Sequence, residues 1–356
     1  MKIEHEARLK QIAPLWRMPF RPFFAAIAIY SCLALLLWVL QMTRGIGGVD
    51  LMWHLHEMIM GFAATTVVGF VLTASQTWTG VKTVSGRALM LLFLLWVVVR
   101  ISWYAAAVDY GVAGGLELLF FSLVALAFGR QVVIAKNWRN AFFVGVFTAL
   151  GLINAAYGYY LSSGDLVAAK HLLMVAFFLI VHVVLVIGGR VIPFFSDRGL
   201  QRAATIKPAW LEWCSLISSV LFIVLYLVQV SGEYLQVSAL AVAVFNSMRW
   251  LNWKPWQVLS KPILWSLYVS YLFLILGFVF IAVGLHQSAA IHLLAIGGFG
   301  LMILAMISRV SLGHSGRPLQ LAKGFWVAYV AIIIAALVRV AAQFYPLYYV
   351  ELLWGA

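Results

Sequence analysis

Long apolar stretches separated by short polar ones run along the whole chain. A helix needs about 20 mostly apolar residues to cross the hydrocarbon core of a bilayer. The pattern predicts spans at 22–42, 54–75, 88–108, 112–129, 141–161, 168–188, 210–230, 234–248, 262–283, 288–308 and 323–343. A further stretch, 345–356, is too short to cross at about 1.5 Å per residue, so either it forms a partial helix or the chain is cut short there.

Composition supports a membrane protein. Of the 356 residues, 65% are hydrophobic and 10% are charged, whereas an average soluble domain is roughly a quarter charged. Lipid is the solvent that accepts this much apolar surface. With few prolines and no long polar linker, we expect an all-α bundle of about twelve transmembrane helices forming one domain over residues 1–356.

The net charge of +13 reflects topology. Lys and Arg gather on cytoplasmic loops, and alternate loops of the predicted bundle are basic. The basic residues of these loops are Lys2, Arg8, Lys10, Arg17 and Arg21; Lys82 and Arg87; Arg130, Lys136 and Arg139; Arg190, Arg198, Arg202 and Lys207; Arg249, Lys254 and Lys261; and Arg309, Arg317 and Lys323. The opposite loops hold only Arg44 and Lys170. We therefore expect a cytoplasmic N-terminus and no nucleic-acid partner.

Cysteines and aromatic residues carry little specific chemistry. Cys32 and Cys214 stand in separate apolar segments without a C-x-x-C motif, which excludes a c-type haem attachment and disfavours a disulfide framework. Aromatic residues near span ends are typical of an interfacial belt. We assign to this belt Trp16, Trp53, Trp78, Trp103, Trp138, Trp210, Tyr157, Tyr159 and Tyr160.

Histidines mark three of the predicted helices. His54 and His56 open the second, His171 opens the sixth, and His292 opens the tenth. All four begin at the outer membrane boundary by the predicted topology. Neutral imidazole is a common metal ligand, so they form a candidate metal or haem set. The alternative is that they merely lie among lipid headgroups. His54 and His56 point about 200° apart on a helix, so they cannot face one ligand together but could serve two centres on opposite faces.

Other histidines extend this picture. His182 lies three turns after His171, on nearly the same face and about 16 Å deeper, where it could ligate a second centre or line a path. His286 is expected in a loop, and His5 outside any site. The stretch Ala168-Ala169-Lys170-His171-Leu172-Leu173 matches Ala289-Ala290-Ile291-His292-Leu293-Leu294. With the even spacing of the histidine-bearing helices, this match suggests three arcs of four helices around a pseudo-threefold axis.

Three further ionisable residues fall inside predicted spans or beside the histidines. Arg100 and Arg339 lie within spans, where an unpaired charge is costly. They could bind haem propionates, or they could snorkel to headgroups or pair with Glu57 or Glu117. Glu57 shares a face with His54, so it could orient an imidazole, act as a ligand, or pair with an arginine.

Several motifs resemble the NnrS family. The first is Trp53-His54-Leu55-His56-Glu57-Met58 followed by Gly61-Phe62-Ala63-Ala64, with Leu72-Thr73-Ala74 and Trp78-Thr79-Gly80 after it. The second, Gly189-Arg190-Val191-Ile192-Pro193-Phe194-Phe195, is expected after the sixth helix. The third runs from Met302-Ile303-Leu304-Ala305-Met306 to Leu312-Gly313-His314-Ser315-Gly316-Arg317-Pro318. These blocks span nearly the whole chain in family order.

The resemblance implies a bacterial inner-membrane protein of about twelve helices that contains haem and copper. It also implies a role in nitric oxide metabolism or resistance to nitrosative stress. It draws attention to His314, which topology places on the cytoplasmic side. His314 would serve a separate site or hold its glycine-rich loop. The short C-terminus departs from the family and leaves the twelfth helix open.

Three functions stay open at this point. The first is a haem and copper protein that binds or converts nitric oxide at the outer histidines, supplied by a membrane or periplasmic electron donor. Neither an adjacent His-His pair in the seventh helix nor a His-x-x-x-Tyr in the sixth is present, so a full haem-copper reductase site is not expected. The second is a transporter for copper or a small nitrogen compound. The third is a non-catalytic membrane partner in a complex.

Overall fold

A computed structural model describes residues 12–105 and 108–355. It is built from helices, and no strand occurs in these two ranges. The basic residues Lys2, Arg8 and Lys10, and His5, lie outside the described residues. The chain divides into two compact units, of which the first ends at Phe177 and the second begins at Phe178. The prediction of an all-α polytopic bundle is confirmed.

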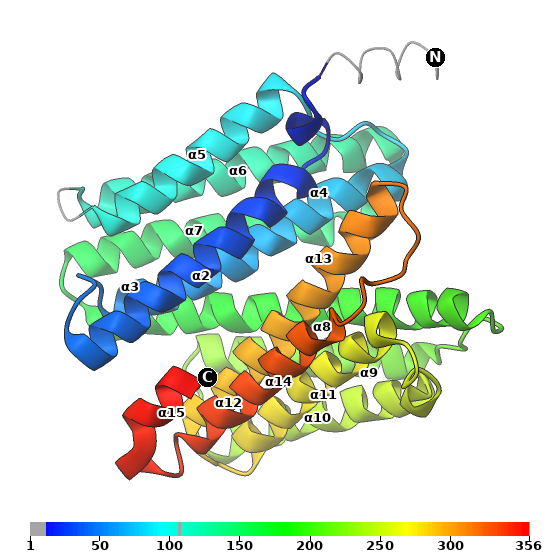
Figure 1. Ribbon diagram of the computed structural model, residues 1–356. Helices are drawn as coiled ribbons and strands as arrows, with labels where there is room; N and C mark the ends of the chain where they lie inside the picture. Colours follow the sequence, from blue (N-terminus) through cyan, green and yellow to red (C-terminus); the bar gives the residue numbers. More distant parts are fainter. Residues whose placement is uncertain (1–11, 106–107, 356) are drawn as a thin grey trace. The chain divides into compact units, whose positions relative to one another are not determined.

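The first unit contains the helices that carry His54 and His56 (Figure 1). Its elements are η1 (Pro14–Arg17), α2 (Phe20–Arg44), α3 (Leu51–His56), η2 (Glu57–Ala64), α4 (Thr65–Thr79), α5 (Arg87–Tyr104), α6 (Tyr110–Ala135), η3 (Trp138–Asn140), α7 (Phe142–Ser162) and the start of α8 (Leu166–Leu200). Helices α6 and α7 run side by side and pack closely. Their glycines Gly114 and Gly158 allow this, because a Cβ on Gly114 would lie 2.9 Å from the Asn154 carbonyl oxygen.

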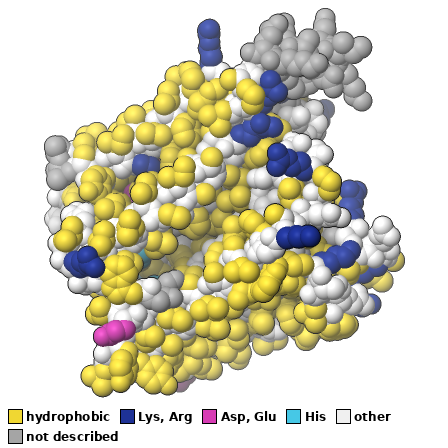
Figure 2. Space-filling view, in the orientation of Figure 1, with side chains coloured by type: hydrophobic (Ala, Val, Ile, Leu, Met, Phe, Trp, Pro, Cys, Tyr) yellow, Lys and Arg dark blue, Asp and Glu magenta, His cyan; other side chains and the backbone are white. Residues whose placement is uncertain are grey.

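The second unit contains the rest of α8 and all later helices. Its further elements are α9 (Ala209–Leu227), α10 (Glu233–Asn252), η4 (Pro255–Gln257), α11 (Pro262–Ala282), α12 (Gln287–His292), η5 (Leu293–Gly300), α13 (Leu301–His314), α14 (Trp326–Ala341), η6 (Pro346–Tyr348) and α15 (Tyr349–Gly355). Helix α11 is the centre of its packing and contacts α10, α12, η5 and α13. Figure 2 shows apolar side chains over the flanks of the helices and basic ones at helix ends.

Each of the eleven predicted spans overlaps a helix in the part of the chain that the structure describes. Within residues 12–105 and 108–355, nine helices are long and apolar enough to cross a membrane. The predicted spans 234–248 and 323–343 correspond to α10 and α14, which are not among those nine. Helix α10 includes the buried polar side chains Asn246 and Arg249, and α14 is a shorter apolar helix of 16 residues. The protein is a multi-pass membrane protein.

Helix α8 is longer than predicted. It continues from Leu166 to Leu200, so the Gly189–Phe195 motif lies inside the helix rather than after it. Proline normally ends such a helix because it lacks the N–H that would bond to the carbonyl four residues earlier. For Pro193 that carbonyl belongs to Gly189, and it accepts a hydrogen bond of 3.0 Å from Lys207 Nζ. The replacement donor explains why the helix tolerates this proline.

Two of the histidine-bearing helices contain a π-helical segment directly after a histidine. η2 begins at Glu57, after His56, and η5 begins at Leu293, after His292. Each is eight residues long and has a glycine five positions after its histidine, Gly61 and Gly297. Helix α8 is α-helical throughout. The first and third predicted arcs therefore share a π segment. The position of this segment makes His56, and not His54, the counterpart of His292. The threefold arrangement itself stays a prediction.

Candidate functional site

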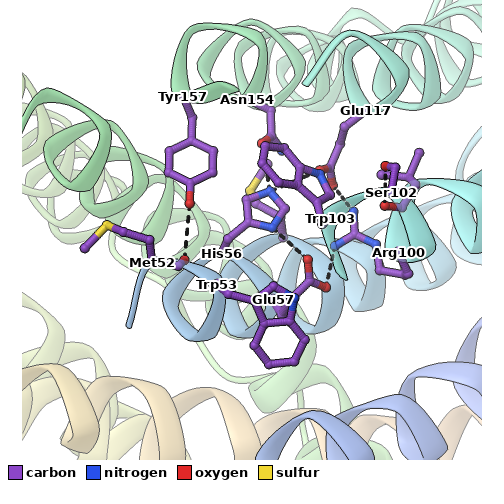
Figure 3. Close-up of polar contacts among 12 residues, drawn as sticks. Met52, Trp53, His56, Glu57, Arg100, Ser102, Trp103, Glu117, Asn154 and Tyr157 are labelled. Carbon is purple, nitrogen blue, oxygen red and sulfur yellow. Dashed lines mark hydrogen bonds and ion pairs between the residues drawn. The ribbon is translucent and has the colours of Figure 1, made fainter. Parts of the chain in front are cut away.

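The first unit buries a cluster of charged side chains in its interior (Figure 3). Asp50 caps α3 by accepting a 2.7 Å hydrogen bond from the Trp53 amide, and the helix that follows carries His56 and Glu57 to the interior. Asp109 caps α6 in the same way, and Glu117 projects from that helix two turns later. His56, Glu57, Arg100 and Glu117 are each 4% exposed or less.

His56 lies between two acidic side chains. Its Nδ1 is 2.8 Å from Glu57 Oε1, and its Nε2 is 2.9 Å from Asn154 Oδ1 and 3.1 Å from Glu117 Oε2. The ring stacks on Tyr157, with centroids 5.1 Å apart, and packs against Trp103. Both ring nitrogens therefore have polar partners, which fixes the orientation of the imidazole.

Arg100 joins the two carboxylates. Nη1 donates to Glu57 Oε2 at 2.8 Å, and Nη2 donates to Glu117 Oε1. Glu57 also accepts from Tyr30 Oη, and Glu117 from Trp103 Nε1 at 2.7 Å. Of the alternatives for Arg100, pairing with Glu57 and Glu117 is the one found. Glu57 thus pairs with an arginine and orients an imidazole, which is that of His56 and not that of His54, the histidine expected to share its face.

Gly61 makes room for this pairing. A Cβ at this position of η2 would meet Glu57 Oε2 and would lie 2.8 Å from Arg100 Nη1 and 3.0 Å from Tyr30 Cε1. The glycine lets the guanidinium approach the helix backbone closely. Such π segments often occur at functional sites, where they redirect side chains.

Sequence reasoning missed part of this cluster. Trp103 and Tyr157 were assigned to an interfacial belt, but they are 5% and 1% exposed and pack on His56. That assignment is wrong for both, because proximity to a span end does not reveal which way a side chain points. Tyr30 and Asn154 were not singled out. An asparagine three residues before a tyrosine in an apolar helix, as in α7, was the available signal for Asn154.

The other predicted histidines lie in different surroundings. His54 is half-buried and stacks on Trp38 of α2, with centroids 4.5 Å apart. His171 is half-buried near the start of α8. His182 is buried, with Nδ1 2.8 Å from Ser219 Oγ of α9. His286 precedes α12 and contacts the ring of Phe344.

His292 lies in the second unit, at the last position of α12. Its Nδ1 is 2.6 Å from the Ser288 carbonyl oxygen. A carbonyl oxygen only accepts, so Nδ1 carries the proton and Nε2 keeps a lone pair. Because His54 and His171 belong to the first unit, the predicted common outer cluster stays a prediction. In the part of the chain that the structure describes, no three His, Cys, Asp or Glu side chains form a group that could hold a metal ion.

Arg339 differs from Arg100 in its partners. Its Nη2 donates to Tyr349 Oη at 3.0 Å, and the guanidinium lies over that ring. Its Nη1 is buried and has no hydrogen-bond partner within residues 12–105 and 108–355. Helix α14, which carries Arg339, packs against α12. Arg339 thus keeps one donor for an additional acceptor.

The second unit contains another buried network that the sequence did not reveal. Arg249, assigned to a cytoplasmic loop, lies in the last turn of α10 and is 4% exposed, so that assignment is wrong. Its Nε and Nη2 donate to the two carboxylate oxygens of Glu212 at 3.0 and 2.8 Å. Its Nη1 donates to Tyr271 Oη and Ser215 Oγ, both at 2.9 Å. Gly189 of α8 gives the guanidinium its space.

A sequence model of the NnrS protein family matches residues 14–356. No curated protein sequence and no solved structure gives a significant match. The family match covers the buried cluster around His56, the π segments after His56 and His292, and the Gly189–Phe195 motif. Because the match extends over nearly the whole sequence, this chain is a member of the NnrS family.

Proposed function

We propose that this protein holds haem and copper in the inner membrane of a bacterium and acts in nitric oxide metabolism or nitrosative-stress resistance. Membership of the NnrS family supports this proposal. The N-terminus would be cytoplasmic, and electrons would come from a membrane or periplasmic donor. Haem iron with an open coordination position would supply the site at which nitric oxide binds.

His292 is the residue that supports haem binding best. Its Nδ1–H donates to the Ser288 carbonyl oxygen at 2.6 Å, which leaves the Nε2 lone pair for a ligand. Metal-binding histidines commonly donate their other ring N–H to a backbone carbonyl in this way, which fixes the tautomer and the ring orientation. This hydrogen bond is the observation that carries the proposal.

Arg339 is suited to bind a propionate group of the haem. Helix α14 packs against α12, and Arg339 Nη1 has no hydrogen-bond partner among the described residues. A guanidinium with a spare donor suits a propionate carboxylate. Arg100 is less suited, because both of its terminal nitrogens already donate to carboxylates.

His182 resembles His292 in its tautomer. Ser219 Oγ donates to the Ser215 carbonyl oxygen at 2.9 Å, so it accepts a hydrogen bond from His182 Nδ1, which carries the proton. His56 is less suited to direct ligation, because both ring nitrogens have polar partners. The copper part of the proposal rests on family membership, with His54, His171 and His182 as candidate ligands.

The test is spectroscopic. Protein purified in detergent from cells supplied with copper and a haem precursor would be measured oxidised, reduced and with nitric oxide, and its iron and copper counted. We expect a Soret band from about one haem per chain that shifts when nitric oxide binds. His292→Ala should lose most of this haem. His286→Ala, at an exposed position just before α12, should keep it.

Two outcomes would contradict the proposal. A colourless wild-type protein would contradict the proposal that the protein binds haem. Metal without haem, together with copper uptake in vesicles, would favour the alternative of a transporter. If His292→Ala kept as much haem as His286→Ala, His292 would not be a ligand. In that case His182→Ala would be measured next.

A further inference from the structure

The second unit contains a cavity of about 950 Å³ at one end of its helices. It is bounded by the end of α8, the start of α11, the end of α13 and the loop that leads into α14. These segments include basic residues that the charge pattern assigns to the cytoplasmic side. His314, predicted to serve a separate site or its own loop, lies in the wall of this cavity.

The charged side chains in the wall of the cavity are all basic. Basic side chains of Arg198, Lys261, Arg309 and Lys323 line the cavity, and no aspartate or glutamate does within the described residues. Asp197, next to Arg198, is not in the wall and pairs with Arg202 at 2.7 Å. The cavity is therefore suited to an anion.

Arg309 is the buried basic residue of this wall. The sequence placed it in a loop, but it lies in α13 and is only 7% exposed. Its guanidinium lies 3.8 Å from the centroid of the Phe195 ring. In the part of the chain that the structure describes, it forms no hydrogen bond or ion pair. A buried guanidinium held only by an aromatic face retains its donors for an acidic ligand.

The rest of the wall is apolar and partly open. Phe194 and Trp326 line the cavity and are 47% and 49% exposed. Arg198 lies over the Phe194 ring, 4.5 Å from its centroid, so a second guanidinium is held at this end. Basic side chains next to exposed apolar ones, at the membrane boundary, suit a ligand with an acidic head and an apolar tail.

We propose that this cavity binds one anionic phospholipid of the cytoplasmic leaflet. Its phosphate would meet Arg309 and Arg198, and its acyl chains would lie along Phe194 and Trp326. Basic pockets between transmembrane helices on the cytoplasmic side bind such headgroups in general. The proposal does not depend on haem or nitric oxide, because its residues are separate from His292 and Arg339.

The test is native mass spectrometry of the whole protein in detergent, titrated with dioleoyl phosphatidylglycerol or, for comparison, dioleoyl phosphatidylcholine. We expect one phosphatidylglycerol to remain bound under conditions that strip phosphatidylcholine. Arg309→Gln should weaken this binding at least tenfold. Arg317→Gln is the matched control, because it removes the same charge from an exposed position in the loop after α13 that does not line the cavity.

Two further variants keep the test decisive if Arg309→Gln does not fold. Arg309→Lys keeps the charge and should bind with intermediate affinity, and Arg198→Gln changes a more accessible side chain and should weaken binding severalfold. Equal binding of the two lipids, or equal effects of Arg309→Gln and Arg317→Gln, would overturn the proposal. Loss of haem from Arg309→Gln with unchanged lipid binding would also overturn it, since the cavity would then hold a porphyrin carboxylate.

Discussion

At the scale of single residues, the structure pairs buried charges almost completely. Arg100 contacts two carboxylates, and Arg249 contacts one carboxylate together with hydroxyl groups. A bilayer offers no water to replace a lost partner, so these networks must be satisfied within the protein. Arg339 departs from this rule, since its buried Nη1 has no hydrogen-bond partner among the described residues, and Arg309 lies over the face of an aromatic ring instead of beside a carboxylate. Arg309 and Arg339 can therefore bind an acidic ligand, whereas every guanidinium nitrogen of Arg249 already has a partner.

Arg100→Gln should be strongly destabilising. It leaves Glu57 and Glu117 buried together without the guanidinium that joins them. Removing one partner of a buried ion pair typically costs about 3–5 kcal/mol. We expect a clearly lower midpoint of thermal unfolding in detergent than for Arg130→Gln, which removes the same charge from an exposed position of α6. Equal midpoints would show that the buried pairing contributes little to stability.

At the scale of elements, the π segments and the proline of α8 show how close contacts shape single helices. η2 and η5 each place a glycine against a neighbouring side chain, since a Cβ on Gly297 would meet Phe273 much as one on Gly61 would meet Glu57. Pro193 is tolerated because Lys207 satisfies the freed carbonyl. Neither feature follows from helix propensity.

Gly61→Ala should therefore destabilise the protein, although alanine is the better helix former by about 1 kcal/mol. The new methyl group would displace Glu57, Arg100 or Tyr30. Gly115→Ala is the matched control, because it lies in α6 with open space around it, and it should be neutral or slightly stabilising. The midpoints of thermal unfolding of the two variants test this prediction. A Gly61→Ala protein as stable as Gly115→Ala would mean that the cluster adjusts at little cost.

At the scale of the whole molecule, the alternation of basic loops predicts the orientation in the membrane. In a protein with Cys32 and Cys214 replaced by alanine, Ser163→Cys should react with a membrane-impermeant maleimide in intact cells. Ser260→Cys should react only after permeabilisation. Both positions are exposed and receive the same substitution. The reverse pattern would place the N-terminus outside and would move the Arg309 cavity to the outer face.

The site could be predicted only in part. His56, Glu57, Arg100 and Glu117 were visible as ionisable residues in apolar segments, and pairing of the arginine with the glutamates was one of the alternatives. Asn154 and Tyr157 lie about a hundred residues from His56, and nothing in the sequence marks them as its neighbours. Arg249 and Arg309 were assigned to loops because a charge at a span end usually faces water.

The sequence alone determined the helical class, the order of the spans, the family and the charge pattern. Each of these depends on local composition, because each segment responds to lipid or water over its own 20 or so residues. The tertiary structure decided which side chains share an interior, which glycines admit a guanidinium, and where a basic cavity forms. Those depend on the rotation and pairing of helices, which join residues such as Glu57 and Arg100 across 43 positions of the chain.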